Sequence, residues 1–185
     1  MATAAHRALL LAHPDTPGEW VWSIAADVGL EAGTLVCHYA LQGEVGRLRV
    51  PAVRAGRRAD ELWQHTCFEV FAAAAGSEDY YEFNFSPSLD WAAYHFRGYR
   101  AGMTPASLAR APGLTSRRTA GRLELTAHLH LEGLAALARA PRLRLGLTAV
   151  IEDEGGTLSY WALRHAPGNP DFHDPGGFAL EIETA

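Results

Sequence analysis

The sequence contains no lysine: all 16 of its basic residues are arginine, against 21 acidic residues, and the formal net charge is −5. Proteins that bind nucleic acids usually present a basic patch, so this balance argues against a nucleic-acid partner. Cysteine is also scarce, with only Cys37 and Cys67. Two cysteines cannot build a disulfide framework or a cysteine-rich metal site. Each falls in a strand-like run, and we interpret both as buried thiols.

Long apolar runs are also missing. The N-terminal apolar segment, residues 8–12, has five residues and is followed by His13 and Pro14. A membrane-spanning helix needs about 20 apolar residues, and the apolar region of a signal peptide is also longer than this segment. We therefore expect a soluble protein without a membrane partner, cytoplasmic by default. A length of 185 residues is typical of one domain, and we expect residues 1–185 to form a single ligand-binding domain.

The dominant pattern is an alternation of apolar and polar residues. Residues 122–131 place leucine at positions 123, 125, 129 and 131, and residues 142–151 repeat the pattern. A period of two predicts half-buried antiparallel strands. Further strand-like runs are residues 8–12, 20–28, 35–41, 47–50, 65–72, 80–86, 91–97, 158–164 and 178–183.

Turn residues separate these runs, and little helix is expected. One short helix is expected over residues 132–140, and residues 98–118 are expected to form a long loop. About ten strands with almost no helix predict an all-β fold, an antiparallel β-sandwich.

The three strand-like runs within residues 62–97 have short connections, which predicts a meander. If Phe68 and Val70 point into the core, alternation also points the following side chains inward: Tyr81, Phe83, Phe85, Ala92, Tyr94 and Phe96. The opposite face then carries His65, Cys67, Glu69, Phe71, Tyr80, Glu82, Asn84, Ser86, Trp91, His95 and Arg97. Such a mixture of carboxylates, imidazoles, a guanidinium and rings is typical of a sugar-binding surface. The alternative is a solvated sheet face with cross-strand charge pairs.

Four motifs resemble a known superfamily. They are W-Q-H-T-C-F-E-V-F from Trp63, Y-Y-E-F-N-F-S-P-S from Tyr80, W-A-A-Y-H-F from Trp91, and H-A-P-G-N-P-D-F-H-D-P-G-G-F-A-L-E-I at residues 165–182. The chain resembles the DOMON-like superfamily of β-sandwich ligand-binding domains, and its small stand-alone bacterial members in particular. That superfamily includes family 9 carbohydrate-binding modules and haem-binding cytochrome domains. The resemblance implies a sandwich that binds a small ligand, but the ligand varies within such a group.

The resemblance also implies roles for individual residues. Trp63 and Glu69 match the carbohydrate-module pattern of a tryptophan six residues before a glutamate. There the tryptophan is one wall of an aromatic sandwich and the glutamate binds sugar hydroxyls; Trp161 is the candidate for the second wall. With the polar face, the expected ligand site comprises Trp63, His65, Glu69, Glu82, Asn84, Arg97 and Trp161. We expect a non-catalytic protein that binds a carbohydrate or a glycan-derived compound.

A metal site is a weaker hypothesis. The C-terminal loop offers four side chains that can ligate metals: His165, Asp171, His173 and Asp174. Their spacing matches no metal site of known geometry. The loop is also rich in proline and glycine, so hydrogen bonds from these side chains to the backbone explain them equally well. We expect no bound metal.

Two further alternatives stay open. In a DOMON-like cytochrome, Met103 would be the methionine ligand of a haem, which would be non-covalent because C-x-x-C-H is missing from the sequence. In a small sugar-processing enzyme, Glu69 and Glu82 would form the acid/base pair. No G-x-S-x-G motif accompanies them. We expect neither a cofactor nor catalysis.

Overall fold

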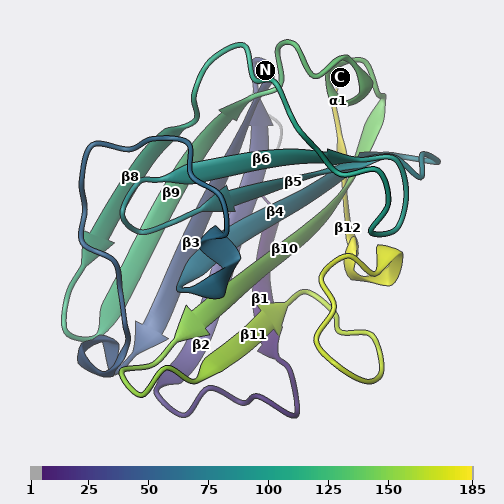
Figure 1. Cartoon of the computed structure of the whole chain (residues 1–185). Helices are drawn as coiled ribbons and strands as arrows, with labels where there is room; N and C mark the ends of the chain where they lie inside the picture. Colours follow the sequence, from purple (N-terminus) through teal and green to yellow (C-terminus); the bar gives the residue numbers. More distant parts are fainter. Residues whose placement is uncertain (1–5, 185) are drawn as a thin grey trace.

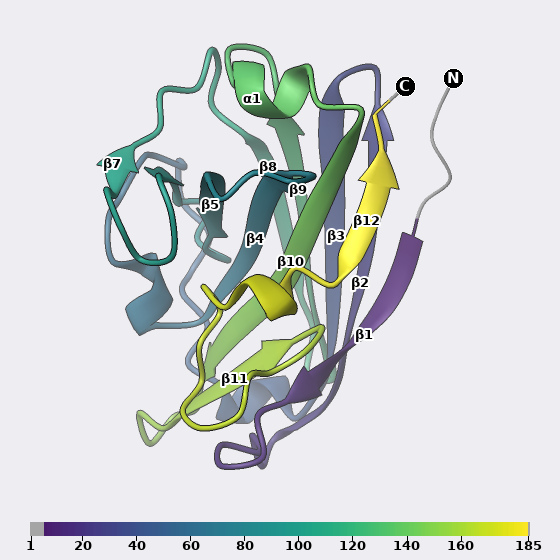
Figure 2. The ribbon, with the colours of Figure 1, turned by 90° about the vertical axis from the view of Figure 1, so that its right-hand side faces the viewer.

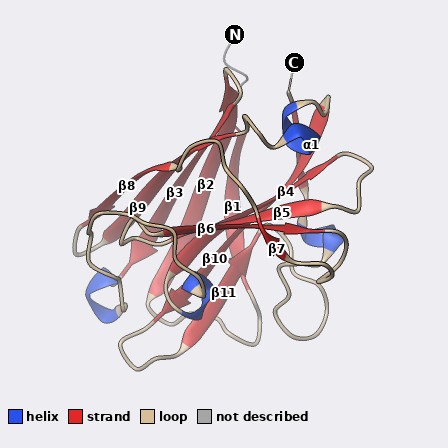
Figure 3. Cartoon of the chain, turned by 45° about the horizontal axis from the view of Figure 1, so that its top comes forward, coloured by secondary structure: helices blue, strands red, loops and turns tan. Residues whose placement is uncertain are grey.

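The computed structural model describes residues 6–184, whose regular structure is almost entirely antiparallel β-sheet (Figure 1 and Figure 3). The strands are β1 His6–Ala12, β2 Val21–Glu31, β3 Thr34–Gly43, β4 Cys67–Ala74, β5 Tyr80–Phe85, β6 Trp91–Phe96, β7 Thr104–Pro105, β8 Gly113–Arg118, β9 Arg122–His130, β10 Arg142–Glu152, β11 Leu158–Ala162 and β12 Leu180–Glu183. The short helical segments are η1 Val45–Arg47, η2 Leu62–Gln64, α1 Ala135–Ala138 and η3 Pro175–Gly177. None of the helices in this range is long and apolar enough to cross a membrane. The predicted all-β fold with one short α-helix is confirmed.

The strands form two layers that are joined along one edge (Figure 2). The first layer has the order β1-β2-β3-β9-β8, and the second has the order β7-β6-β5-β4-β10-β11, with β12 also paired to β10. Strand β1 makes the junction because it pairs with β2 and, through Leu11 and Ala12, with β11. The result is a curled β-sandwich whose second layer carries the predicted meander.

Alternating side chains from both layers fill the space between them. The leucines of β9 and β10 are almost fully buried there: Leu123, Leu125, Leu129, Leu143, Leu145 and Leu147. Burying such a side chain contributes about 1.5–3 kcal/mol. The alternation predicted for residues 122–131 and 142–151 is therefore confirmed. In each strand, the face that carries the leucines is the face that packs between the two layers.

The second layer is covered on both faces. On β4, Phe68 and Val70 belong to the core between the layers, while Phe71 belongs to a second apolar cluster on the outer face. Phe172 and Phe178 of the C-terminal segment pack on that outer cluster. A strand that is buried on both faces does not need to alternate apolar and polar residues, so the sequence pattern does not report its orientation.

The register of the meander corrects the expected orientation of its third strand. Phe85 pairs with Trp91, and Glu82 pairs with Tyr94. Direct cross-strand partners share a face, so Tyr94 and Phe96 lie on the outer face with Glu82. The predicted inward set for this strand, Ala92, Tyr94 and Phe96, is wrong. The cause is the outer apolar cluster, which buries aromatic rings that would otherwise have to face the core.

Three predictions of local structure also need correction. Residues 47–50 do not form a strand; η1 is followed by an isolated bridge at Leu48, because Val45 and Leu48 are buried by a turn. The helix expected over residues 132–140 shrinks to α1, since Gly133 has a φ of +86° that a helix cannot include. Residues 98–118 are not one loop, because β7 and β8 within them pair with β6 and β9.

Candidate functional site

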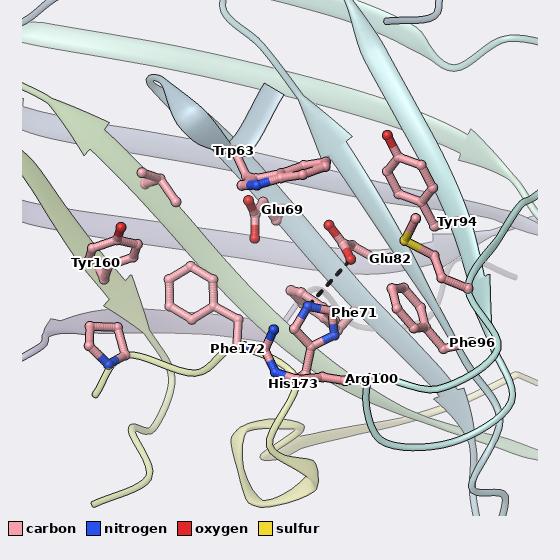
Figure 4. Close-up of a pocket in the computed structure, with 13 residues that line it drawn as sticks. Trp63, Glu69, Phe71, Glu82, Tyr94, Phe96, Arg100, Tyr160, Phe172 and His173 are labelled. Atoms are coloured by element: carbon pink, nitrogen blue, oxygen red, sulfur yellow. Dashed lines mark ion pairs between the residues drawn. The ribbon is translucent and has the colours of Figure 1, made fainter. Parts of the chain in front are cut away.

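A pocket with a volume of about 370 Å³ opens on the outer face of the second layer (Figure 4). Outward side chains of β4, β5, β6, β10 and β11 form its floor. The walls are η2, the turn after β6 and the segment between β11 and β12. The lining residues are Trp63, Glu69, Phe71, Glu82, Tyr94, Phe96, Arg100, Met103, Val150, Tyr160, Pro170, Phe172 and His173. The pocket thus combines many aromatic rings with a few ionisable groups, as small-molecule sites commonly do.

Two buried carboxyl groups lie at the floor. Glu69 is 2% exposed and Glu82 is 6% exposed. They are diagonal neighbours, because Glu69 pairs with Asn84 and Glu82 pairs with Phe71 across β4 and β5. The Thr148 hydroxyl donates to Glu69 Oε2 at 3.2 Å, and Asn84 Nδ2 donates to Glu82 Oε1 at 2.7 Å. Glu69 Oε1 is buried and has no hydrogen-bond partner.

This environment changes the proton affinity of both carboxyl groups. Burial raises the pKa of Glu69 well above its usual range, and the charge of Glu82 raises it further. Burial also raises the pKa of Glu82, although the Asn84 hydrogen bond and the Arg100 charge oppose the shift. A raised pKa means that the neutral form is favoured. The pair therefore holds a proton more tightly than exposed glutamates do.

Trp63 supplies the exposed aromatic surface at the rim. Trp63 is 38% exposed, and its indole meets the Tyr94 ring edge-on, with 6.0 Å between ring centroids. The Tyr94 hydroxyl donates to Asp60 Oδ1 at 2.7 Å, which ties the chain just before η2 to β6. In Figure 4 the indole lies beside Glu69 and Glu82, on the side of the pocket away from His173. A flat apolar surface and two acceptor groups therefore face the same space.

His173 and Arg100 form the opposite wall. Burial, together with the nearby Arg100 charge, lowers the pKa of His173 to about 4, so its ring is neutral near pH 7. His173 Nε2 lies 3.8 Å from Glu82 Oε2, too far for a strong hydrogen bond. Arg100 Nη2 pairs with Asp171 Oδ1 at 2.7 Å, which fastens the C-terminal segment to the turn after β6.

Four of the seven predicted site residues lie at or beneath the pocket. Trp63, Glu69 and Glu82 line it. Asn84 is fully buried beneath the floor and holds Glu82 in place by the hydrogen bond described above. The prediction that Glu69, Glu82 and Asn84 share one sheet face, opposite Phe68, is confirmed by the register.

The other three predicted residues lie outside the pocket. The side chain of His65 is 60% exposed and contacts Glu152 Oε2 at 2.7 Å, because His65 precedes β4 and does not follow its alternation. Arg97 follows the end of β6 and is not among the residues that line the pocket. Trp161 is 5% exposed and belongs to the inner core.

The sequence prediction missed most of the aromatic lining. Tyr160 lines the pocket in the place expected for Trp161, because a shift of one residue along a strand moves a side chain to the other face. Phe172 and His173 come from the loop for which metal binding was the alternative. Within residues 6–184, no group of three or more histidine, cysteine, aspartate or glutamate side chains is arranged to hold a metal ion. The feature of the sequence that could have indicated this wall is the presence of aromatic residues, Phe172 and Phe178, in that loop.

No protein-family model matches the sequence, and no curated protein matches it. Solved structures with a similar fold include the following two. A candidate carbohydrate-binding protein from Bacteroides uniformis gives a TM-score of 0.69 at 14% identity, covering 95% of this chain and 84% of that one. A family 9 carbohydrate-binding module from Caldicellulosiruptor kristjanssonii in complex with cellotriose gives a TM-score of 0.53 at 13% identity, covering 87% and 74%. The chain therefore shares the β-sandwich fold of a family 9 carbohydrate-binding module.

Proposed function

We propose that this protein binds a carbohydrate in the pocket beneath Trp63 and releases it unchanged. One observation carries the proposal: an exposed tryptophan and two buried carboxyl groups line the same pocket, and Glu69 Oε1 among them has no hydrogen-bond partner. Sugar rings present C–H groups on a flat face and hydroxyl donors around the edge. The indole can stack on the C–H groups, and the carboxyl groups of Glu69 and Glu82 can accept hydrogen bonds from the hydroxyls. A hydrogen bond to a charged group contributes about 1.5–3 kcal/mol.

The fold similarity supports the proposal in one respect. The module from Caldicellulosiruptor kristjanssonii is described in complex with cellotriose, so a sandwich of this architecture takes a sugar in that protein. The pocket volume of about 370 Å³ also falls in the range of small-molecule sites.

Haem binding has less support in the same pocket. Met103 and His173 both line it, so two side chains that can ligate haem iron are present. The floor, however, presents the buried carboxyl groups of Glu69 and Glu82 where a flat apolar macrocycle would lie. Burying a carboxyl group against an apolar surface is unfavourable. These residues fit a haem poorly.

Hydrolysis also has less support. A glycosidase places its two carboxyl groups on either side of the scissile bond. Glu69 and Glu82 rise from adjacent strands of one sheet face, so a sugar lying on the floor would meet both from the same side. This arrangement suits hydrogen bonding to one ring better than acid/base catalysis across a glycosidic bond.

Isothermal titration calorimetry with a panel of monosaccharides and β-linked disaccharides tests the proposal. We expect a weak to moderate affinity that falls at least several-fold in Trp63→Ala and in Glu82→Gln. Trp22→Ala is the matched control, because Trp22 is 69% exposed on β2 in the other layer. Absence of binding across the panel, or an equal loss in Trp22→Ala, would reject the site.

A further inference from the structure

The charges around the pocket are unbalanced. Glu69 and Glu82 line it, and Arg100 is the only arginine among the described lining residues. The Arg100 guanidinium is paired with a third carboxylate, Asp171, through Nη2 and Oδ1 at 2.7 Å. His173 is neutral near pH 7 because burial and Arg100 lower its pKa to about 4. The site therefore carries more negative charge than positive charge whenever both glutamates are ionised.

Hydrogen bonding at the floor is unbalanced in the same direction. Glu69 receives one side-chain hydrogen bond, from Thr148, and its Oε1 receives none. Asn84 is the direct cross-strand partner of Glu69, and its buried Oδ1 also has no donor. Leaving a buried acceptor without a donor is unfavourable. The floor has too few hydrogen-bond donors for its acceptors, and the pocket has less positive than negative charge.

We propose that the natural ligand is an amino sugar whose protonated amino group lies between Glu69 and Glu82. This inference rests on the proposed carbohydrate-binding function and narrows its ligand class. An ammonium group brings three donors to the floor and one positive charge to the pocket. Glu69 Oε1 is available to it, and Glu82 Oε2 has only the distant contact with His173.

The aromatic lining favours the same group. Trp63, Phe71, Tyr94, Phe96 and Phe172 surround the carboxyl groups. The faces of aromatic rings attract cations, and the attraction is stronger when the cation is desolvated. A neutral sugar gains the stacking but not this attraction. When a neutral sugar is bound, Glu69 and Glu82 also keep a shared proton, because two like charges at close range disfavour ionisation of both groups.

Three sugars that differ at one substituent test the inference. Glucosamine, glucose and N-acetylglucosamine carry an ammonium, a hydroxyl and a neutral amide at the same carbon. Calorimetry at about pH 6.5, where amines of this kind are protonated, would compare them as monosaccharides and as β-1,4 disaccharides. We expect the amino form to bind at least about tenfold more tightly than the hydroxyl form, and the acetylated form to lose the gain.

Variants then locate the amino group. Glu69→Gln and Glu82→Gln should reduce the preference for glucosamine over glucose toward parity, with folding checked by circular dichroism. Glu183→Gln, an exposed position on β12, is the matched control and should leave the preference unchanged. Glucose binding as tightly as glucosamine, and still depending on Trp63, would overturn the inference and leave the proposed function standing. Failure of all the sugars to bind would overturn both. If both glutamine variants still bound glucosamine more tightly than glucose, the placement of the amino group between Glu69 and Glu82 would be wrong.

Discussion

Tyr80 and His173 are joined by a hydrogen bond of 2.8 Å between the Tyr80 hydroxyl and His173 Nδ1. The Arg100 amide donates to the same hydroxyl at 3.2 Å, and we assign the hydroxyl hydrogen to the bond with Nδ1. A neutral imidazole that accepts at Nδ1 carries its proton on Nε2, the atom 3.8 Å from Glu82 Oε2. A tyrosine of β5 therefore sets the proton position on a wall residue of the pocket and holds the C-terminal segment over the sheet.

Tyr80→Phe removes this hydrogen bond and keeps the ring, which stacks on Phe96 with 4.8 Å between centroids. We expect the free energy of unfolding to fall by about 1 kcal/mol and sugar affinity to fall several-fold. Nitrogen chemical shifts of His173 should change from one defined tautomer to a mixture. Tyr81→Phe on the opposite sheet face is the control. An unchanged His173 tautomer in Tyr80→Phe would contradict the assignment.

The two tryptophans that the sequence suggested as walls should respond in opposite ways. Trp161 is buried in the inner core, with its Nε1 donating to Ser159 Oγ at 3.0 Å. Trp161→Ala should therefore lower the free energy of unfolding by about 3–5 kcal/mol, as large-to-small core substitutions do. Trp63→Ala should change stability little and binding strongly. Chemical denaturation of both variants measures this. A small change in the free energy of unfolding for Trp161→Ala would contradict its burial in the core and would favour the original hypothesis that Trp161 contacts the ligand.

Elements with one buried face were predictable from the sequence. Leu123 and Leu125 alternate with polar residues because one side of β9 meets the core. The face shared by Glu69 and Glu82 followed from the same rule. The rule failed at β6, where the aromatic rings Tyr94 and Phe96 suggest a core-facing side although they line the outer pocket.

The failure has a physical cause. The outer face of the second layer is covered by Phe172 and Phe178, which lie far along the chain. A local pattern contains no information about a segment that arrives from a distance and buries the second face. The fold and the carboxyl pair were therefore accessible from sequence, whereas the C-terminal wall with His173 required the tertiary structure.

Purified protein should show no Soret absorbance, and added haemin should not produce a spectrum that depends on Met103. The expected reason is that Glu69 and Glu82 present ionisable groups to the space where a haem would lie. Difference spectroscopy of the native protein and of Met103→Leu measures this. A Soret band that shifts in Met103→Leu would favour the cytochrome-like alternative over sugar binding.

Removing the charge of Glu69 should stabilise the unliganded protein in a pH-dependent way. Burial and the charge of Glu82 raise the pKa of Glu69, while the Thr148 hydroxyl lowers it. Below about pH 4.3, the usual glutamate pKa, the carboxyl group is protonated in both the folded and the unfolded chain. Between that value and the raised pKa, the folded chain keeps a proton that the unfolded chain has released. Stability is therefore lost as pH rises through this window, by at most about 1.4 kcal/mol per pH unit.

Glu69→Gln lacks this titration, so its stability advantage over the native chain should grow with pH across the window and then level off. Urea unfolding at a series of pH values measures the difference. Glu82 titrates in the same pocket, and Glu82→Gln should show the same trend with a smaller amplitude, because Arg100 and Asn84 stabilise its charged form. Glu183→Gln, at an exposed position, is the matched control. A difference between Glu69→Gln and the native chain that stays flat with pH would mean that Glu69 is solvated in the free protein. The buried acceptor without a donor, which is one of the observations that support amino-sugar binding, would then be lost.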